Sequence, residues 1–175
     1  MIADCDSRFS IEKLQSSHIR KSFTCGITSL DTYLQKQATQ DERRHVAVTY
    51  ILHDAECNVV AGFYTLSSMT IESRCLSQAI TKKLPNYPLI PATLIGRLAI
   101  DKEYQGKKLG EILLMDALHR FCESSKAIAS FAVVVEAINK EAVRFYEKYG
   151  FIHLIAHEKL LYMAIKAIEQ MLCLV

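Results

Sequence analysis

The sequence lacks the features that mark membrane and secreted proteins. Its longest apolar stretch, residues 127–135, is far shorter than the ~20 residues that a membrane-spanning helix needs. The first six residues show neither the basic start nor the apolar run of a secretion signal. We therefore expect a soluble protein of the cytoplasm that makes no contact with a membrane.

The chain is also short of metal and redox motifs. None of its six cysteines forms a C-x-x-C pair, which argues against a zinc knuckle and a redox site. His153 and His157 are four residues apart but lack the glutamate of an H-E-x-x-H metal motif. We expect no metal, a strand and a turn position for the two histidines, and reduced thiols at Cys5, Cys25, Cys57, Cys75, Cys122 and Cys173.

Charge of one sign is not in excess. The net charge of +2 is too small to indicate nucleic-acid binding by itself, and no stretch interleaves aromatic and basic residues as RNA-binding modules do. Basic residues do gather locally, and each cluster taken alone is typical of a solvated surface. The clusters are Lys36 with Arg43, Arg44 and His45, the pair Lys82 and Lys83, and the pair Lys107 and Lys108.

The chain has enough apolar sequence for one folded core. With 175 residues, 50% hydrophobic and 23% charged, it predicts a single domain over residues 1–175. We further predict Ser29 as a helix N-cap, a strand at 93–100 buried on both faces, and an irregular connection at Pro85, Pro88 and Pro91. Periodicity predicts strands at 9–14, 45–52, 59–71, 93–100, 131–135, 151–155 and 159–165, and helices at 29–43, 76–84, 108–123 and 141–148. These patterns alone support an α/β or an α+β fold.

The most informative segment is the strand, turn and helix over residues 97–118. A strand that passes through a glycine turn into a helix directs main-chain N–H groups and the helix dipole at one point, which suits a phosphate. Neither the GxGxxG of a dinucleotide fold nor the Lys-Ser/Thr ending of a P-loop is present. The turn reads Gln105-Gly106-Lys107-Lys108-Leu109-Gly110 and predicts a nucleotide-cofactor site of another kind.

This segment resembles motif A of the GCN5-related N-acetyltransferases (GNAT family), in which an apolar-Asp strand end precedes Gln/Arg-x-x-Gly-x-Gly/Ala. It departs from the motif at Lys108, where glycine is expected, so either this residue keeps a negative φ or the turn is rebuilt. The run at 139–151 is similar to a second family motif, Asn-x-x-Ala-x-x-Phe-Tyr-x-x-x-Gly-Phe. Two motifs in the family's order identify it far more specifically than one.

The resemblance implies the GNAT fold, with a mixed central sheet of about six to seven strands, helices on both faces and a splayed pair of central strands. It spans roughly residues 9–165, which leaves a tail at 166–175 as a docking helix or a partner contact. It also implies acetyl-CoA as the acetyl donor. The main chain of Leu98, Ala99 and Ile100 would bind the pantetheine and thioester, and the diphosphate would lie on Gln105, Gly106, Lys107, Lys108, Leu109 and Gly110.

Two residues of the second motif carry further expectations from the resemblance. We expect Asn139 to contact pantetheine, and Tyr146 both to bind the cofactor at its sulfur and to act as the general acid. A phenol with a pKa near ~10 can protonate a departing thiolate, whose reference pKa is ~8.5. The alternative for Tyr146 is a structural aromatic packed between strand and helix.

A narrower resemblance lies in the N-terminal third. The string Phe23-Thr24-Cys25-Gly26-Ile27-Thr28-Ser29-Leu30-Asp31-Thr32-Tyr33-Leu34 is similar to the opening of acetyltransferase toxins from bacterial toxin-antitoxin pairs. Taken alone, it predicts only a tight turn followed by core residues. Such toxins acetylate the α-amino group of aminoacyl-tRNA and block translation. The resemblance also implies a homodimer and a ribbon-helix-helix antitoxin, in a complex that can bind operator DNA.

The residues near the strand end fit such a substrate. A lysine amine with a pKa near ~10.4 is almost wholly protonated at neutral pH, whereas an α-amino group near ~7.7–8.0 is partly free base. Arg97 precedes Leu98 where a carboxylate base would stand, which favours a polyanion, and Glu136 is the one rival base. We expect tRNA phosphate contacts from Lys36, Arg43, Arg44, Lys82, Lys83 and Arg97.

Two other functions stay open at this point. A non-toxic acetyltransferase for a small amine or a protein N-terminus would share the cofactor site. A degenerate GNAT-fold binding protein would have lost catalysis, which Lys108 in place of the motif glycine permits.

Overall fold

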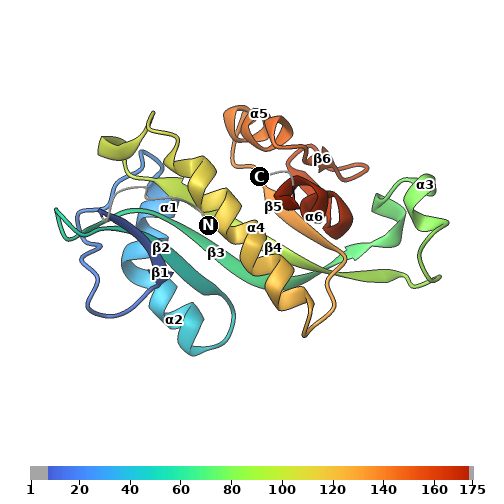
Figure 1. The fold of residues 1–175 in the computed structure, drawn as a ribbon, viewed down its shortest axis with the longest axis horizontal. Helices are drawn as coiled ribbons and strands as arrows, with labels where there is room; N and C mark the ends of the chain where they lie inside the picture. Colours follow the sequence, from blue (N-terminus) through green and yellow to red (C-terminus); the bar gives the residue numbers. More distant parts are fainter. Residues whose placement is uncertain (1–7, 174–175) are drawn as a thin grey trace. The chain divides into compact units, whose positions relative to one another are not determined.

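The computed structural model describes residues 8–173, which form a seven-stranded sheet and its helices (Figure 1). The expectations for the first six residues and for Cys5 lie outside the described residues, as do the last two residues of the C-terminal tail. The strands hydrogen-bond in the order β1-β2-β3-β4-β5-β7-β6. Their bounds are β1 Phe9–Lys13, β2 Val48–Asp54, β3 Val59–Glu72, β4 Leu89–Ile100, β5 Ala132–Glu136, β6 Ile152–His153 and β7 Leu160–Ala164.

The helices occur between these strands in the predicted order. The longest, α4, follows the predicted glycine turn, and α5 ends before Gly150, whose φ of +90° closes the helix as expected. The helical bounds are α1 Thr28–Thr32, the π-helical η1 Tyr33–Gln37, α2 Ala38–Arg43, the 3-10 turn η2 Ser73–Cys75, α3 Gln78–Thr81, the 3-10 turn η3 Lys102–Tyr104, α4 Leu109–Ser125, α5 Lys140–Lys148 and α6 Ile165–Cys173.

The sheet is mixed, as the resemblance implied. Strands β4 and β5 run parallel, whereas β1 and β2, β2 and β3, β5 and β7, and β6 and β7 pair antiparallel. The parallel ladder joins residues 92–95 to residues 132–135 and ends there, while β4 continues to Ile100. The splayed pair of central strands stays a prediction.

Three local expectations are wrong. Helix α1 begins at Thr28 with Ile27 as its N-cap and no side-chain cap, so Ser29 lies inside the helix, because the Asp31 side chain bonds the preceding turn instead. Pro91 is a residue of β4, since its carbonyl can accept a ladder bond from Phe131 N even though it has no N–H to donate. Residues 93–100 are not buried on both faces, because only Ile95 and Ala99 are buried there and the other six residues are half-buried.

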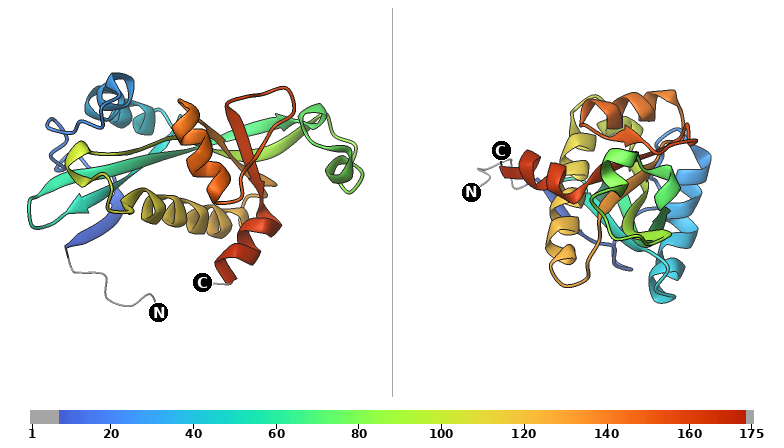
Figure 2. Two further views of the ribbon diagram at one scale, coloured as in Figure 1. Left: turned by 90° about the horizontal axis from the view of Figure 1, so that it is seen from above. Right: turned by 90° about the vertical axis from the view of Figure 1, so that its right-hand side faces the viewer.

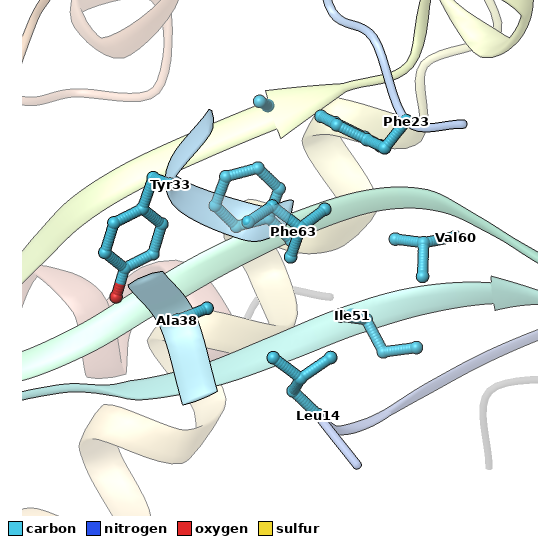
Figure 3. Close-up of a cluster of buried hydrophobic side chains, with 9 residues drawn as sticks. Leu14, Phe23, Tyr33, Ala38, Ile51, Val60 and Phe63 are labelled. Carbon is cyan, nitrogen blue, oxygen red and sulfur yellow. The ribbon is translucent and has the colours of Figure 1, made fainter. Parts of the chain in front are cut away.

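The described residues divide into two compact units, residues 8–67 with 96–117, and residues 68–95 with 118–173. In the first unit, Figure 2 shows the helical segment 28–43 on one face of β2 and β3 and the first half of α4 on the other. The ring of Phe63 packs edge-on against Phe23 and stacks on Tyr33, with ring centroids 5.4 and 6.2 Å apart. This core contains Leu14, Phe23, Tyr33, Leu34, Ala38, Ile51, Val60, Phe63 and Ala99 (Figure 3).

The helical segment 28–43 is interrupted by the π-helical turn η1. Tyr33 and Leu34 open this turn and Ala38 follows it, and all three side chains are buried. A π-helical turn holds one residue more than an α-helical turn. The segment can therefore bury the neighbouring side chains of Tyr33 and Leu34 together with Ala38.

The second unit is built around β5. Residues 132–135 are completely buried because β4 and β7 flank the strand, and the surrounding core includes Ile71, Ile90 and Tyr162. The C-terminal tail forms α6, whose Ile168 is completely buried. Helix α6 follows directly from β7, and the choice between a docking helix and a partner contact stays a prediction.

Candidate functional site

The loop from β4 to α4 keeps the shape of a glycine turn, although Lys108 replaces one glycine. Gly106 and Lys108 have φ angles of +78° and +59°, both in the left-handed region. A negative φ at Lys108, one of the two possibilities left by the sequence, is therefore excluded. A residue with a side chain bears a strain of about 1–2 kcal/mol in this conformation, which glycine does not.

The same loop presents main-chain donors without acceptors. Within residues 8–173, the N–H groups of residues 106–110 have no hydrogen-bond acceptor, because the first main-chain bonds to the start of α4 come from Glu111 and Ile112 to Lys108 O. The helix dipole adds partial positive charge at this end of α4, and Lys107 and Lys108 are exposed beside it. The predicted loop is thus suited to bind an anion such as a diphosphate.

The end of β4 lies tightly against β3. A Cβ on Gly62 would lie 2.6 Å from Ile100 Cδ1 and 3.0 Å from Ala99 O, so only glycine fits at this position. Asp101 N donates to Ala61 O at 2.9 Å. The main chain of Leu98, Ala99 and Ile100, for which the sequence predicts contact with pantetheine, is therefore held by the neighbouring strand.

Gln105 opens the loop and uses its side chain within the protein. Its Nε2 donates to Cys25 O and to Ile100 O, each at 3.0 Å. The preceding Asp101 is only 7% exposed, and it accepts from Thr24 N at 2.8 Å and from Glu103 N at 3.0 Å. The sequence singled out the loop but not these bonds, although the Asp of the apolar-Asp strand end was the available signal.

Tyr146 lies on α5, in the second unit. Its ring packs against Phe145 and Phe151 with centroids 5.3 and 5.5 Å apart, and the residue is 5% exposed. The hydroxyl has no hydrogen-bond partner in the described part of the chain, yet it is not one of the completely enclosed unpartnered oxygens. Burial raises the pKa of Tyr146. The phenol therefore stays protonated at physiological pH.

Asn139 and Glu136 lie near the two ends of the segment that joins β5 to α5. Asn139 is the N-cap of α5, since its Oδ1 accepts from Ala142 N at 2.8 Å, which leaves its amide nitrogen for a ligand. Glu136 is exposed at the end of β5, where its main chain pairs with Leu160. Both positions agree with the strand and helix ends that the sequence predicted.

The basic candidates fall into two groups. In the first unit the Arg97 guanidinium lies 3.6 Å above the centre of the Tyr33 ring, a cation–π contact that fixes its direction. The turn that carries Tyr33 also carries the exposed Lys36, and Arg43 and Arg44 are exposed at the end of α2. The second group, Lys82 and Lys83, is exposed after α3 in the second unit.

The buried carboxylate of Asp54, which the sequence analysis did not single out, helps to hold the start of the loop at residues 105–110. Asp54 is completely buried and accepts from Arg8 and from the Tyr104 hydroxyl, each at 2.7 Å. The Arg8 guanidinium holds the pKa of Asp54 well below its usual range, although burial acts in the opposite direction. Tyr104 directly precedes Gln105, so the β1–β2 pair braces the start of the loop.

Two further expectations concern metals and membranes. His153 lies in β6 and bonds Glu147 at 3.2 Å, and His157 lies in a turn 3.7 Å from Cys75 Sγ, so the strand and turn positions are confirmed. Among residues 8–173 no group of three or more suitable side chains could hold a metal ion. No helix in the same range combines the length and the apolar character needed to cross a bilayer.

Comparison with known sequences matches this chain to acetyltransferases. A family model described as "Acetyltransferase (GNAT) domain" matches residues 88–160. The chain is also 32% identical over 130 residues to a tRNA-acetylating toxin of Mycobacterium tuberculosis. That alignment covers 74% of this chain and 76% of the relative.

Comparison with solved structures agrees. AtaT complexed with acetyl-methionyl-tRNAfMet superimposes with a TM-score of 0.87 at 32% identity, over 94% of this chain and 99% of AtaT. AtaTR bound with AcCoA superimposes with a TM-score of 0.82 at 32% identity, over 94% of this chain and 98% of the solved chain. Other structures show AtaT bound to the C-terminus of the antitoxin AtaR, and the AtaT-AtaR complex bound to DNA.

Proposed function

Because the chain belongs to the GNAT family of acetyltransferases and, within it, to the tRNA-acetylating toxins, we propose that it acetylates the α-amino group of aminoacyl-tRNA and so blocks translation. The observation that carries the proposal is the loop of residues 106–110. It offers unpartnered N–H groups at a helix N-terminus and follows a strand end fixed in place. That arrangement suits the diphosphate and pantetheine of acetyl-CoA.

When bound, acetyl-CoA supplies an activated acetyl group as a thioester. The main chain of Leu98, Ala99 and Ile100 orients the pantetheine and the thioester carbonyl, and donors already held in place stabilise negative charge without reorganising. In the transfer, the amine would displace coenzyme A from the acetyl group. Tyr146 would donate its phenolic proton to the departing thiolate and regain a proton, through water, from the acylated amine. Its protonated, unpartnered hydroxyl supports this role.

The chain needs no strong base for this substrate. An α-amino group with a pKa of ~7.7–8.0 is partly uncharged at neutral pH, so water can remove the second proton after attack. Glu136 at the end of β5 is the alternative base. Lys36, Arg43, Arg44, Lys82, Lys83 and Arg97 are the proposed contacts to tRNA phosphates.

The partners follow from the same assignment. We infer a cognate antitoxin, because the related AtaT is solved bound to AtaR and in a DNA complex with it. A ribbon-helix-helix antitoxin, a homodimeric toxin and a cytoplasmic site of action, where charged tRNA is found, complete the proposal. We also infer that residues 1–175 act as one acetyltransferase domain.

The direct test incubates the protein with radiolabelled acetyl-CoA and a pool of charged tRNAs, and then identifies the labelled species. Label on aminoacyl-tRNA with wild-type protein, and its loss with Tyr146→Phe, is the expected result. Label only on a small amine or a protein N-terminus would favour a non-toxic acetyltransferase. Absence of acetyl-CoA binding in calorimetry would leave only a degenerate binding protein.

A cellular test separates the toxin from an ordinary acetyltransferase. Induced expression in a bacterium should arrest growth with the wild-type chain and not with Tyr146→Phe, because arrest requires acetyl transfer. Normal growth at equal soluble expression of the wild-type chain would contradict the toxin assignment.

A further inference from the structure

Residues 23–25, termed the strap, have their main-chain polar groups bound on one side by the helical segment. Phe23 O accepts from Gln35 Nε2 at 2.9 Å, and Cys25 N donates to Asp31 Oδ1 at 2.8 Å. Both partners belong to the segment that starts at Thr28. The strap is thus anchored to α1 and to the π-helical turn.

Three other main-chain groups of the strap are bound by the residues that lead into the cofactor loop. Thr24 N donates to Asp101 Oδ2 at 2.8 Å, Thr24 O accepts from Lys102 N at 2.9 Å, and Cys25 O accepts from Gln105 Nε2 at 3.0 Å. The strap therefore forms a continuous hydrogen-bonded connection between the helical segment and the start of the loop. All of these residues belong to the first unit.

Gly26, which directly follows the strap, allows the chain to lie close to residues 101–105. Its φ of +94° is left-handed, and a Cβ there would lie 3.0 Å from Lys102 Cε. A larger residue would be strained and would push against the Lys102 side chain. The Phe-x-Cys-Gly string of the sequence therefore has a physical meaning, because it lets the strap fit against residues 101–105.

Gln105 has no donor left for a ligand. A primary amide carries two N–H donors, and those of Gln105 are directed at Cys25 O and Ile100 O. Its main-chain N–H is directed at Lys102 O, 3.4 Å away. The free N–H groups begin only at the next residue, Gly106.

We propose that Gln105 is a positioning residue, which acts through the strap to hold residues 106–110 in the shape that binds the diphosphate of acetyl-CoA and does not touch the diphosphate itself. The identity of the ligand rests on the proposed function. A strained conformation such as that of Lys108 persists only where its surroundings determine it, and Gln105 supplies that support. Asp31, on the far side of the strap, supports the same loop without lying in it.

The test compares Gln105→Ala, Asp31→Asn and the double variant in calorimetric titrations with coenzyme A. Each single substitution should raise the Kd about 10-fold, and the double should raise it no more than the larger single, because both act through one connection. The KM for acetyl-CoA should rise while kcat stays within about twofold. Gln40→Ala is the matched control, since Gln40 bonds Lys36 O at 3.3 Å on an exposed helix and should leave the Kd unchanged.

An unchanged Kd in either single variant would overturn the proposal. A Kd of the double variant that is raised by the product of the two single fold increases would also overturn it. Should Asp31→Asn not fold, Gln35→Ala takes its place, because Gln35 anchors the same strap at Phe23. Wild-type protein that fails to bind coenzyme A would overturn the proposed function instead. The two failures are therefore distinct.

Discussion

At the scale of single residues, Lys108 combines a strained backbone with a useful charge. Its φ of +59° is one that glycine adopts freely, and the motif has glycine at this position. The lysine instead places a positive charge at the start of α4, next to the unpartnered N–H groups of the loop. Backbone strain is thus tolerated at a position where the lysine strengthens the attraction for an anion.

Lys108→Gly should therefore increase the free energy of unfolding by about 1 kcal/mol relative to Lys108→Ala, because only glycine removes the left-handed strain. Urea denaturation measures the difference. Both variants lose the charge, so both should bind coenzyme A more weakly and with a smaller dependence on salt. Equal stability of the two variants would show that the loop holds lysine without strain.

Tyr146→Phe should lower kcat about 10²- to 10⁴-fold, the usual range for loss of a general acid. Thermal stability should stay the same, because the hydroxyl has no hydrogen-bond partner among the described residues. Stopped or single-turnover assays with labelled acetyl-CoA measure the rate. A Phe variant with wild-type kcat would assign Tyr146 to packing alone.

At the scale of elements, helix α5 depends on Asn139 at its N-cap. Asn139→Ala should destabilise the protein by about 1 kcal/mol, because Ala142 N loses its acceptor. Asn139→Asp keeps an acceptor but removes the amide donor, so it should restore stability. If the amide contacts pantetheine, the Asp variant will still bind coenzyme A more weakly in calorimetry; wild-type affinity would limit Asn139 to capping.

The β1–β2 pair is held by the buried Asp54. Arg8 lowers the pKa of Asp54 in the folded protein, so the carboxylate makes its full contribution to the free energy of unfolding above about pH 5. That contribution is lost as the pH falls below ~3.9, the pKa of the carboxyl in the unfolded chain. Asp54→Asn should destabilise the protein by about 2–4 kcal/mol at pH 7. The difference in free energy of unfolding between the wild type and this variant should become smaller toward pH 2–3. Denaturation across pH measures it.

Glu56→Gln is the control for that series. Glu56 also pairs with Arg8, at 3.0 Å, but its side chain is 65% exposed. An exposed ion pair contributes about 1 kcal/mol or less. If Asp54→Asn lowers the free energy of unfolding no more than Glu56→Gln does, the buried network of Arg8, Asp54 and Tyr104 adds little to stability.

The sequence predicted elements best where the signal was local. The glycine turn before α4 and the helix that ends at Gly150 follow from spacing and φ preference alone. Ser29 was a wrong N-cap because Asp31, two residues later, bonds Cys25 N across the turn. Pro91 entered β4 because a strand position that only accepts a hydrogen bond tolerates proline.

At the scale of the whole molecule, acetyl-CoA should stabilise the folded chain against heat. A ligand that binds only the native state adds about 2.7 kcal/mol at 100 times its Kd. For a chain of this size that corresponds to a rise in Tm of about 5–11 °C. Differential scanning calorimetry with and without acetyl-CoA measures the shift, and an unchanged Tm at millimolar ligand would contradict a cofactor site.

The candidate site was predictable only in part. Residues 105–110 and 139–151 stood out because each motif is contiguous in the chain. The residues that support the loop did not stand out in the sequence, because they come together from distant positions. Arg8, Asp54 and Tyr104 form one such group, and Cys25 and Gln105 form another. Such pairings depend on sheet register and on the packing of the helical segment, neither of which a single sequence specifies.

The π-helical turn at Tyr33–Gln37 has a consequence for the surface beyond it. The wider turn takes up one residue that, in a regular α-helix, would rotate everything after it by roughly 100° about the helix axis. Removal of that residue should therefore restore an ordinary α-helical turn and leave the direction of the exposed Arg43 and Arg44 unchanged. The bulge thus uncouples the length of this segment from the orientation of its basic end.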